Sequence, residues 1–157
     1  SMIKGIFACD TKGGIGKDNK LPWPHSKADM SFFKHVTKGH TVVMGRLTWE
    51  SLPKKPLPNR VNIVITSSEE EFEGCTKMTM EEAEKYLETT DDEVFIIGGA
   101  KVYDHLQKYV KHWFFTVMSG QYDCDTVFKP NLSDFRKLGE ITIQDGIPMS
   151  FKEYSRK

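Results

Sequence analysis

Short apolar segments alternate with helical segments up to residue 108, and this alternation limits the possible folds more than any other feature of the chain. The apolar segments have the length of buried strands and lie at residues 3–9, 41–44, 61–66 and 93–97. The segments with helical periodicity or helix caps lie at residues 26–36, 48–52, 80–87 and 100–108. After residue 110 only strands are expected, at residues 111–120, 126–128, 135–142 and 149–154. These patterns predict one α/β domain with a central mixed, mostly parallel β-sheet of about eight strands, about four helices flanking both faces and an antiparallel C-terminal hairpin.

The length and charge of the chain exclude several classes of protein. Its 157 residues suit a single core, and 22 basic against 22 acidic side chains give a net charge of zero. No apolar run approaches the roughly 18 residues that a membrane span requires. We therefore expect no nucleic-acid partner and no membrane association. A monomer is expected as well, although neither length nor charge decides this point.

The cysteines and the first residues indicate where the protein works. Cys9, Cys75 and Cys124 are far apart and form no Cys-x-x-Cys pair. Because no signal-like leader precedes them, they indicate free thiols in a reducing compartment, so a soluble, cytoplasmic protein is expected. Ser1 before Met2 is typical of an expression-tag remnant, and the domain is predicted to span residues 2–157.

A glycine-rich loop and the helix after it place a carboxylate in an unusual position. The loop covers residues 14–23 and ends in Leu-Pro-Trp. In the following helix, Asp29 shares the apolar stripe of Phe32, Phe33 and Val36, where an unpaired carboxylate is costly to bury. Ser26 and Asp29 also fit a capping box, with Ser26 as the N-cap. The spacing leaves both interpretations open, and a capping acid can also face a pocket.

Three of the predicted parallel strands end in residues suited to phosphate. Ligands bind outside the carboxyl ends of parallel strands, so these ends are expected to share one edge of the sheet. The three ends are Gly45-Arg46, Thr66-Ser67-Ser68 and Gly98-Gly99, the last directly before a helix. Each signal alone is weaker than its ordinary explanation as a turn, a cap or a solvated arginine. Together they favour a dinucleotide groove.

Other kinds of catalysis find little support in the sequence. The five histidines are scattered and form no metal-binding pair, so no metal site is predicted. No Gly-x-Ser-x-Gly motif indicates a nucleophilic serine. A carboxylate on an apolar face beside a dinucleotide groove suits hydride transfer, in which the cofactor carries the chemistry and the protein aligns it.

Taken in order, these motifs closely resemble the dihydrofolate reductase family over nearly the whole chain. The matching segments are Gly-Ile-Gly-x-x-x-x-Leu-Pro-Trp at 14–23, Asp29, Phe33, Met44-Gly45-Arg46-x-Thr48-Trp49-Glu50-Ser51, Pro56-Leu57-Pro58-x-Arg60, Ile97-Gly98-Gly99, Tyr103, Thr116 and Asp125-Thr126-x-Phe128. The resemblance implies an enzyme that uses NADPH to reduce 7,8-dihydrofolate to 5,6,7,8-tetrahydrofolate for one-carbon metabolism, and that binds antifolate inhibitors. It implies hydride transfer to C6 and protonation of N5 through a water.

The resemblance also implies roles for individual residues. Asp29 would hydrogen-bond the pterin with Thr116 and a water near Trp23 behind it, and Leu21 would close over the nicotinamide. The implied catalytic residues are Asp29, Trp23, Leu21 and Thr116. The implied substrate-binding residues are Ile6, Ala8, Asp29, Phe33, Leu52, Leu57, Arg60, Ile97, Tyr103 and Thr116. The implied cofactor-binding residues are Ala8, Ile15, Gly16, Gly45, Arg46, Leu47, Thr48, Thr66, Ser67, Ile97, Gly98, Gly99, Ala100, Lys101, Val102 and Tyr103.

Two alternative functions and two local questions remain at this stage. A riboflavin-pathway reductase of the same fold would share the Gly-Gly turn, but Asp29 and Arg60 favour a folate. A non-catalytic NADPH-binding protein is the other alternative, although the glycine loop and Asp29 are both present. Asn59 stands where the family commonly has glycine, and its tolerance of the left-handed conformation should preserve the turn. The direction in which Phe7 points is left open.

Overall fold

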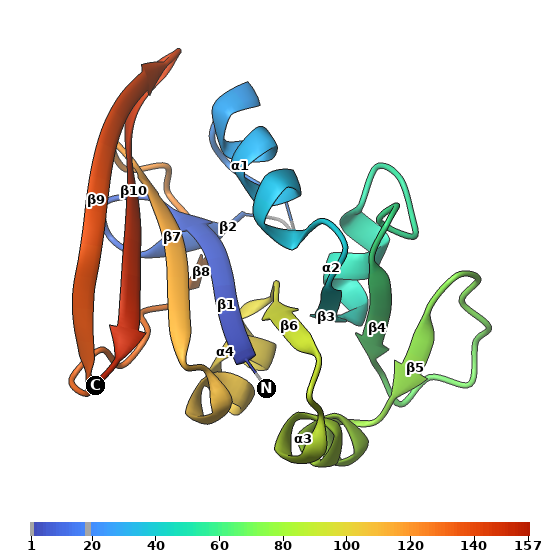
Figure 1. The fold of residues 1–157 in the computed structure, drawn as a ribbon. Helices are drawn as coiled ribbons and strands as arrows, with labels where there is room; N and C mark the ends of the chain where they lie inside the picture. Colours follow the sequence, from blue (N-terminus) through green and yellow to red (C-terminus); the bar gives the residue numbers. More distant parts are fainter. Residues whose placement is uncertain (1, 18–19) are drawn as a thin grey trace.

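A broad twisted sheet forms the centre of the protein (Figure 1). The structure, a computed structural model, describes residues 2–17 and 20–157, so the tag-remnant interpretation of Ser1 and the part of the predicted loop at Asp18 and Asn19 lie outside the described residues. Within those ranges the sheet has eight strands, in the spatial order β5 (Thr76–Met78), β4 (Val61–Ile65), β3 (Thr41–Gly45), β6 (Glu93–Ile96), β1 (Met2–Cys9), β7 (His112–Met118), β10 (Ile147–Arg156) and β9 (Phe135–Asp145). Neighbouring strands from β5 to β7 are parallel, whereas β10 is antiparallel to β7 and β9. The predicted mixed, mostly parallel sheet with an antiparallel hairpin is confirmed.

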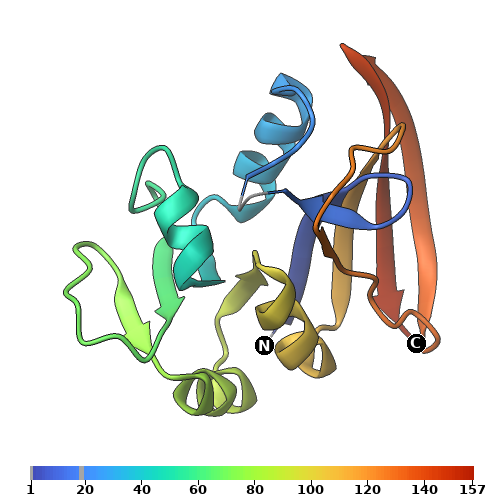
Figure 2. The ribbon, with the colours of Figure 1, turned by 180° about the vertical axis from the view of Figure 1, so that it is seen from behind.

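Helices cover both faces of the sheet, as predicted (Figures 1 and 2). On one face, α1 (Lys27–Thr37) and α2 (Arg46–Ser51) pack Phe32, Phe33 and Trp49 onto the side chains of β3, β4 and β6. On the other face lie α3 (Met80–Thr89), α4 (Ala100–Leu106) and the 3₁₀ turn Gln107–Tyr109, and Leu87 and Leu106 enter the larger core there. Thr79 and Glu82 form a capping box at the start of α3.

Phe7 points into the core beneath α4. Its ring stacks on Phe115 at a centroid distance of 5.0 Å and meets Trp113 and Phe128 edge-on. Because side chains alternate along β1, its neighbour Ile6 faces the opposite core, under α1 and α2. The first strand thus contributes to both cores, and its α1-side residues are free to line a ligand site.

Several short elements differ from the expectation. The predicted loop contains β2 (Gly14–Gly16), which pairs with β8 (Thr126–Val127) in a separate two-stranded sheet, and β5 adds an edge strand. Runs of three residues are too short to show an alternating pattern. Helix α2 begins at Arg46 rather than residue 48, because Gly45 already acts as its N-cap. Strand β9 continues to Asp145, and its mostly exposed residues provide no hydrophobic alternation from which its end could be read.

Two kinds of feature are absent from the part of the chain that the structure describes. No helix in residues 2–17 and 20–157 is long and apolar enough to cross a membrane. Over the same residues, no group of histidine, cysteine and acidic side chains could hold a metal ion.

Candidate active site

A buried hydrogen bond joins the first turn of α1 to the middle of β7. Thr116 Oγ1 donates to Asp29 Oδ1 at 2.8 Å, and Thr116 is only 1% exposed. Ser26 caps the helix by accepting from the Asp29 backbone N–H at 3.1 Å. The capping-box interpretation is therefore correct for Ser26, whereas the Asp29 carboxylate binds across to the sheet. Asp29 keeps its inward position because its acceptor oxygen has a partner there.

Burial controls the charge of this acid. Desolvation raises the pKa of Asp29 above its ordinary value, and the hydrogen bond from Thr116 opposes part of that rise. The carboxyl group lines a cavity of about 220 Å³ between α1 and the preceding loop, together with Leu21, Trp23, Pro24, His25, Ser26 and Met30. An acid with a raised pKa in a partly apolar cavity is a common feature of functional sites.

An apolar wall extends from this cavity along the α1 face of the sheet. Phe33, Leu52 and Leu57 are half-buried, and they pack with Ile6 and Ile97 in one cluster. Ala8 and Trp23 belong to the neighbouring cluster under the C-terminal hairpin. The structure thus brings together the predicted apolar substrate residues on one face. A flat aromatic ligand that enters beside Asp29 would lie against them.

Arg60 stands at the far end of the wall with its guanidinium already oriented. It lies 5.9 Å from the centre of the Phe33 ring, and its Nη1 donates to Thr37 Oγ1 at 3.0 Å. Its Nε donates to Pro58 O at 2.9 Å. Asn59 adopts a φ of 60°, so the left-handed turn expected at this position is confirmed. A fork held in this way suits a carboxylate.

Two buried polar residues support this end of the site, and sequence reasoning missed both. Asn62, 2% exposed, accepts from Leu57 N–H at 2.9 Å and donates to the carbonyls of Leu57 and Arg60 at 3.0 Å. Thr37, which receives the Arg60 bond, is fully buried. A polar residue inside an apolar strand such as β4 was the signal that could have found Asn62, because buried polar groups require partners.

The carboxyl ends of β3 and β6 meet in a cradle of small residues. Gly45 N–H donates to Gly98 O at 2.8 Å, and the Gly98–Gly99 peptide bond is cis. A Cβ on Gly45 would lie 3.1 Å from Val102, and a Cβ on Gly98 would lie 3.3 Å from the Tyr103 hydroxyl and 3.5 Å from Thr48 Oγ1. Gly98 also has a φ of 124°, which L side chains rarely adopt. The ends of β3 and β6 therefore pack so closely here that a side chain at Gly45 or Gly98 would crowd its neighbours.

The remaining predicted cofactor residues have different surroundings. Thr66 and Ser67 line a second cavity of about 220 Å³. The other residues that line it are Ser68, Glu69, Lys77, Met78, Thr79 and Glu82. The guanidinium of Arg46 is engaged by Glu50, at 2.6 Å on the same helix. Ile15, Val102 and Tyr103 pack into the core under α3 and α4, and the Tyr103 hydroxyl donates to Ile6 O at 2.7 Å. Leu47 and Lys101 are exposed, and Gly16, Gly99 and Ala100 are half-buried.

A buried acid holds the base of the glycine loop in place, and sequence reasoning missed it. Asp10 is 3% exposed and accepts from the backbone N–H groups of Lys12, Gly14 and Tyr122 at 2.9, 2.8 and 3.1 Å. Burial raises the pKa of Asp10, but these hydrogen bonds outweigh it, so the pKa lies below its ordinary value. Beyond this anchor, Leu21 is 62% exposed at the rim of the Asp29 cavity. The loop is thus fixed at its base and open at its end.

Comparisons with known proteins agree with this geometry. A family model described as dihydrofolate reductase matches residues 2–156. The dihydrofolate reductase of Bacillus subtilis (strain 168) is 42% identical over 128 residues, which cover 81% of this chain and 75% of that protein. That of Ureaplasma parvum is 32% identical over 157 residues, covering 99% and 98%. A solved structure of dihydrofolate reductase from Enterococcus faecalis, complexed with NADP(H) and RAB-propyl, superimposes with a TM-score of 0.91 at 32% identity and covers 99% of this chain and 96% of its own. The chain belongs to the dihydrofolate reductase family.

Proposed function

We propose that this protein reduces 7,8-dihydrofolate to 5,6,7,8-tetrahydrofolate by hydride transfer to C6 and protonation of N5 through a water. Family membership supports an NADPH-dependent oxidoreductase acting on dihydrofolate. The observation that carries the proposal is the Asp29–Thr116 pair, an inward-facing acid at the end of an apolar wall. A carboxylate suits the paired ring nitrogen and amino group of a pterin, because both are donors.

The residues at the edge of the sheet fit a dinucleotide. The relative from Enterococcus faecalis was solved with NADP(H), and Gly45 and Gly98 let the ends of β3 and β6 approach closely where a Cβ would crowd its neighbours. When bound, NADPH supplies the hydride. We assign the 2′-phosphate to Arg46, Thr66 and Ser67 and the pyrophosphate to residues 98–102, with Thr48 beside it. The other residues that we assign to contacts with the cofactor are Leu47, Ala8, Ile15, Gly16, Ile97 and Tyr103.

Asp29 binds the pterin and adjusts its electronics, but it does not deliver the proton to N5. Thr116 donates to one oxygen of the carboxylate. Because each carboxylate oxygen can accept more than one hydrogen bond, both oxygens can still receive the two donors of the pterin. In this role the carboxylate hydrogen-bonds to the edge of the pterin that lies away from N5. A water must therefore carry the proton to N5. Leu21 and Trp23 line the same cavity, where they limit how much water reaches the ring.

The apolar wall and Arg60 bind the remainder of the substrate. Phe33, Leu52 and Leu57 pack on the aminobenzoyl ring, and Arg60 pairs with the α-carboxylate of the glutamate. We also infer that the protein acts as a monomer in the cytoplasm, where tetrahydrofolate serves one-carbon metabolism. Light scattering checks the first point, because a monomer has a mass of 18.0 kDa.

A direct assay tests the proposed function. NADPH absorbance should fall when dihydrofolate is added, and a diaminopyrimidine antifolate should stop the fall. NADH should support a slower reaction. If NADPH is not consumed in the presence of dihydrofolate, the proposed function is wrong.

A further inference from the structure

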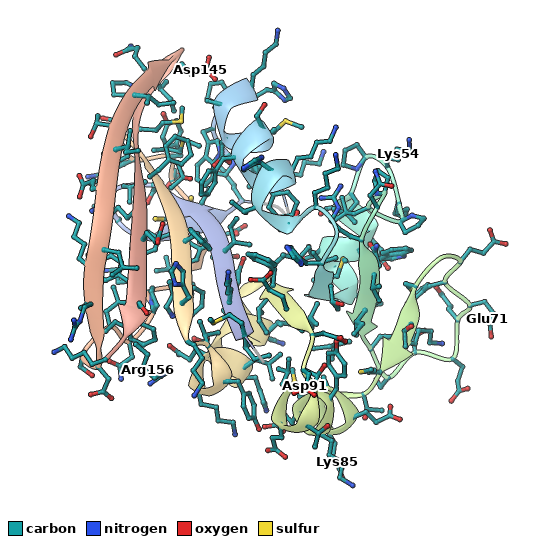
Figure 3. The ribbon with its side chains drawn as sticks, in the orientation of Figure 1. Lys54, Glu71, Lys85, Asp91, Asp145 and Arg156 are labelled. Atoms are coloured by element: carbon teal, nitrogen blue, oxygen red, sulfur yellow. The ribbon has the colours of Figure 1, made fainter. Side chains whose placement is uncertain are left out.

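The turn between β9 and β10 touches the start of the helix that carries Asp29. Asp145, the last residue of β9, accepts from Ser26 Oγ and from the Ala28 backbone N–H, both at 3.0 Å, through the same oxygen, Oδ2. Figure 3 shows Asp145 at the far end of the hairpin, level with the first turn of α1. A carboxylate from the C-terminal part of the chain thus completes the N-terminal cap of the first helix.

These bonds occupy donors that the helix cannot satisfy itself. The first N–H groups of a helix have no partner within it, and their positive end favours an anion. Ser26 provides for the N–H of Asp29, and Asp145 provides for the N–H of Ala28. The hydrogen bonds from Ala28 and Ser26 hold the pKa of Asp145 below its ordinary value, so its carboxylate is charged near neutral pH.

The same turn is also fastened to the strand that carries Thr116. Pro148 O accepts from Ser119 N–H at 2.9 Å, just beyond the end of β7. Within the sheet, Met149 pairs with Met118, and both side chains are buried. The hairpin turn therefore contacts α1 through Asp145 and β7 through Pro148 and Met149.

Ser26 connects this turn to the carboxylate of the site. Its hydroxyl donates to Asp145 and accepts from the Asp29 N–H, so one buried oxygen belongs to both interactions. Ser26 is 5% exposed, and its oxygen also lies 3.7 Å from the sulfur of Met149. Loss of Asp145 would leave the Ala28 N–H without its acceptor and the Ser26 hydroxyl with only the sulfur of Met149, so the first turn of α1 would be tied to the hairpin by a single weak contact.

We propose that Asp145 is a positioning residue, which holds the first turn of α1 so that the Asp29 carboxylate stays at hydrogen-bonding distance from Thr116 and in place for the pterin. This role rests on the proposed function, because it concerns the affinity for dihydrofolate. Asp145 itself contacts neither Asp29 nor Thr116 through any of the hydrogen bonds described above. It acts through Ser26 and Ala28.

The test compares three changes with a matched control. Asp145→Ala removes both hydrogen bonds that the Asp145 carboxylate accepts. Asp145→Asn keeps an acceptor oxygen without the charge. Ser26→Ala removes only the hydroxyl that the two interactions share. Asp91→Ala is the control, because Asp91 is exposed beside α3 at the opposite end of the molecule (Figure 3). We expect Asp145→Ala to weaken dihydrofolate binding about tenfold, and Asp145→Asn and Ser26→Ala to weaken it less. NADPH binding should stay within about twofold of the unmodified protein in every variant.

A double-mutant cycle separates positioning from a general loss of structure. Dissociation constants for dihydrofolate, measured by quenching of tryptophan fluorescence, should respond to Asp145→Ala about tenfold when Asp29 is present and less than about twofold when Asp29 is replaced by asparagine. Equal losses in both backgrounds would overturn the proposal, as would a parallel loss of NADPH affinity. If Asp145→Ala does not fold, Asp145→Asn and Ser26→Ala supply the same comparison.

The outcome also distinguishes this inference from the proposed function. An unmodified protein that does not consume NADPH with dihydrofolate contradicts the proposed function. An active unmodified protein whose Asp145→Ala variant binds dihydrofolate with unchanged affinity contradicts only the role of Asp145.

Discussion

Two opposing effects act on the buried carboxyl group of Asp29, a favourable hydrogen bond and an unfavourable desolvation. It is held at the site by a hydrogen bond from Thr116, and burial raises its pKa because desolvation disfavours the charged form. A group whose pKa is raised on folding binds its proton more tightly in the folded state. Its ionisation therefore lowers stability as pH rises from about 4 through the pKa of the folded protein.

Asp29→Asn should for this reason stabilise the protein and reduce its activity together. Asparagine keeps an acceptor for Thr116 and has no charge to desolvate, so the unfolding temperature at pH 7 should rise by a few degrees. The gain should shrink as pH falls and vanish below about 4, the ordinary pKa that Asp29 has in the unfolded chain. Turnover at pH 7 should fall sharply and recover in part at acidic pH, as the substrate becomes protonated. Thermal unfolding and rate profiles against pH check both effects. Full activity at neutral pH would show that the assigned role is wrong.

We assign Arg60 to the glutamate part of the substrate, so its replacement should affect only ligands that contain this part. A charge-assisted bidentate contact contributes roughly 1.5–3 kcal/mol, so Arg60→Ala should raise KM for dihydrofolate about tenfold or more. A reduced pterin that lacks the glutamate should be unaffected. Arg136→Ala is the control, because Arg136 is exposed on β9. Equal effects on the two substrates would remove Arg60 from the glutamate site.

At the scale of elements, the cofactor edge depends on how α2 begins. Arg46 is the first residue of α2, and its guanidinium is bound by Glu50 one turn later. A phosphate at this position must therefore share Arg46 with a carboxylate. Exposed ion pairs of this type contribute little to stability. A bound phosphate would therefore break the Arg46–Glu50 pair at a small cost in free energy.

Arg46→Ala should narrow the preference for NADPH over NADH. The 2′-phosphate is the difference between the two cofactors, and only NADPH loses a partner in this variant. The ratio of kcat/KM for the two cofactors measures the effect, with Glu50→Gln as the matched variant that frees Arg46. We expect Glu50→Gln to leave the ratio unchanged or to increase it. A ratio unaffected by Arg46→Ala would place the 2′-phosphate elsewhere.

The loop before α1 is anchored through β2, β8 and the buried acid Asp10. Three backbone N–H groups lose their acceptor in Asp10→Ala, so the free energy of unfolding should fall by roughly 3 kcal/mol. Because the pKa of Asp10 is lowered on folding, its contribution is complete above the pKa of the unfolded state and is lost as pH falls through the folded pKa. Urea denaturation at pH 7 should give a lower free energy of unfolding for Asp10→Ala than for the unmodified protein. This difference in free energy should shrink at the most acidic pH at which both proteins fold. Asp134→Ala, at an exposed position, is the control.

At the scale of the whole molecule, the sequence predicts those features of the fold that depend on local patterns of residues. The order of strands and helices, the parallel and antiparallel parts, the Ser26 cap and the turn at Asn59 all follow from periodicity or from single-residue preferences. The grouping of Asp29 with Thr116 came from the family resemblance, since no local pattern relates positions in α1 and β7.

What the sequence left out depends on contacts between distant segments. Asp10, Asn62 and Asp145 read as ordinary polar residues, and only the folded chain shows that they accept from the backbone N–H groups of Tyr122, Leu57 and Ala28, respectively. The Arg46–Glu50 pair was also overlooked, although its i, i+4 spacing could have indicated it. The residues that hold the site in place were thus harder to predict than the residues that form it.

The position of Asp145 has a consequence for synthesis of the protein on the ribosome. Ser26 and Asp145 are separated by 119 positions, so the helix that carries Asp29 emerges long before the carboxylate that completes its cap. At common translation rates this interval is about 6–24 s. During that time the first turn of α1 lacks its partner, and β7 lacks the neighbouring strand β10. The strands β3, β4 and β6, at whose ends we place NADPH, therefore leave the ribosome before the contacts that fix the proposed site for dihydrofolate.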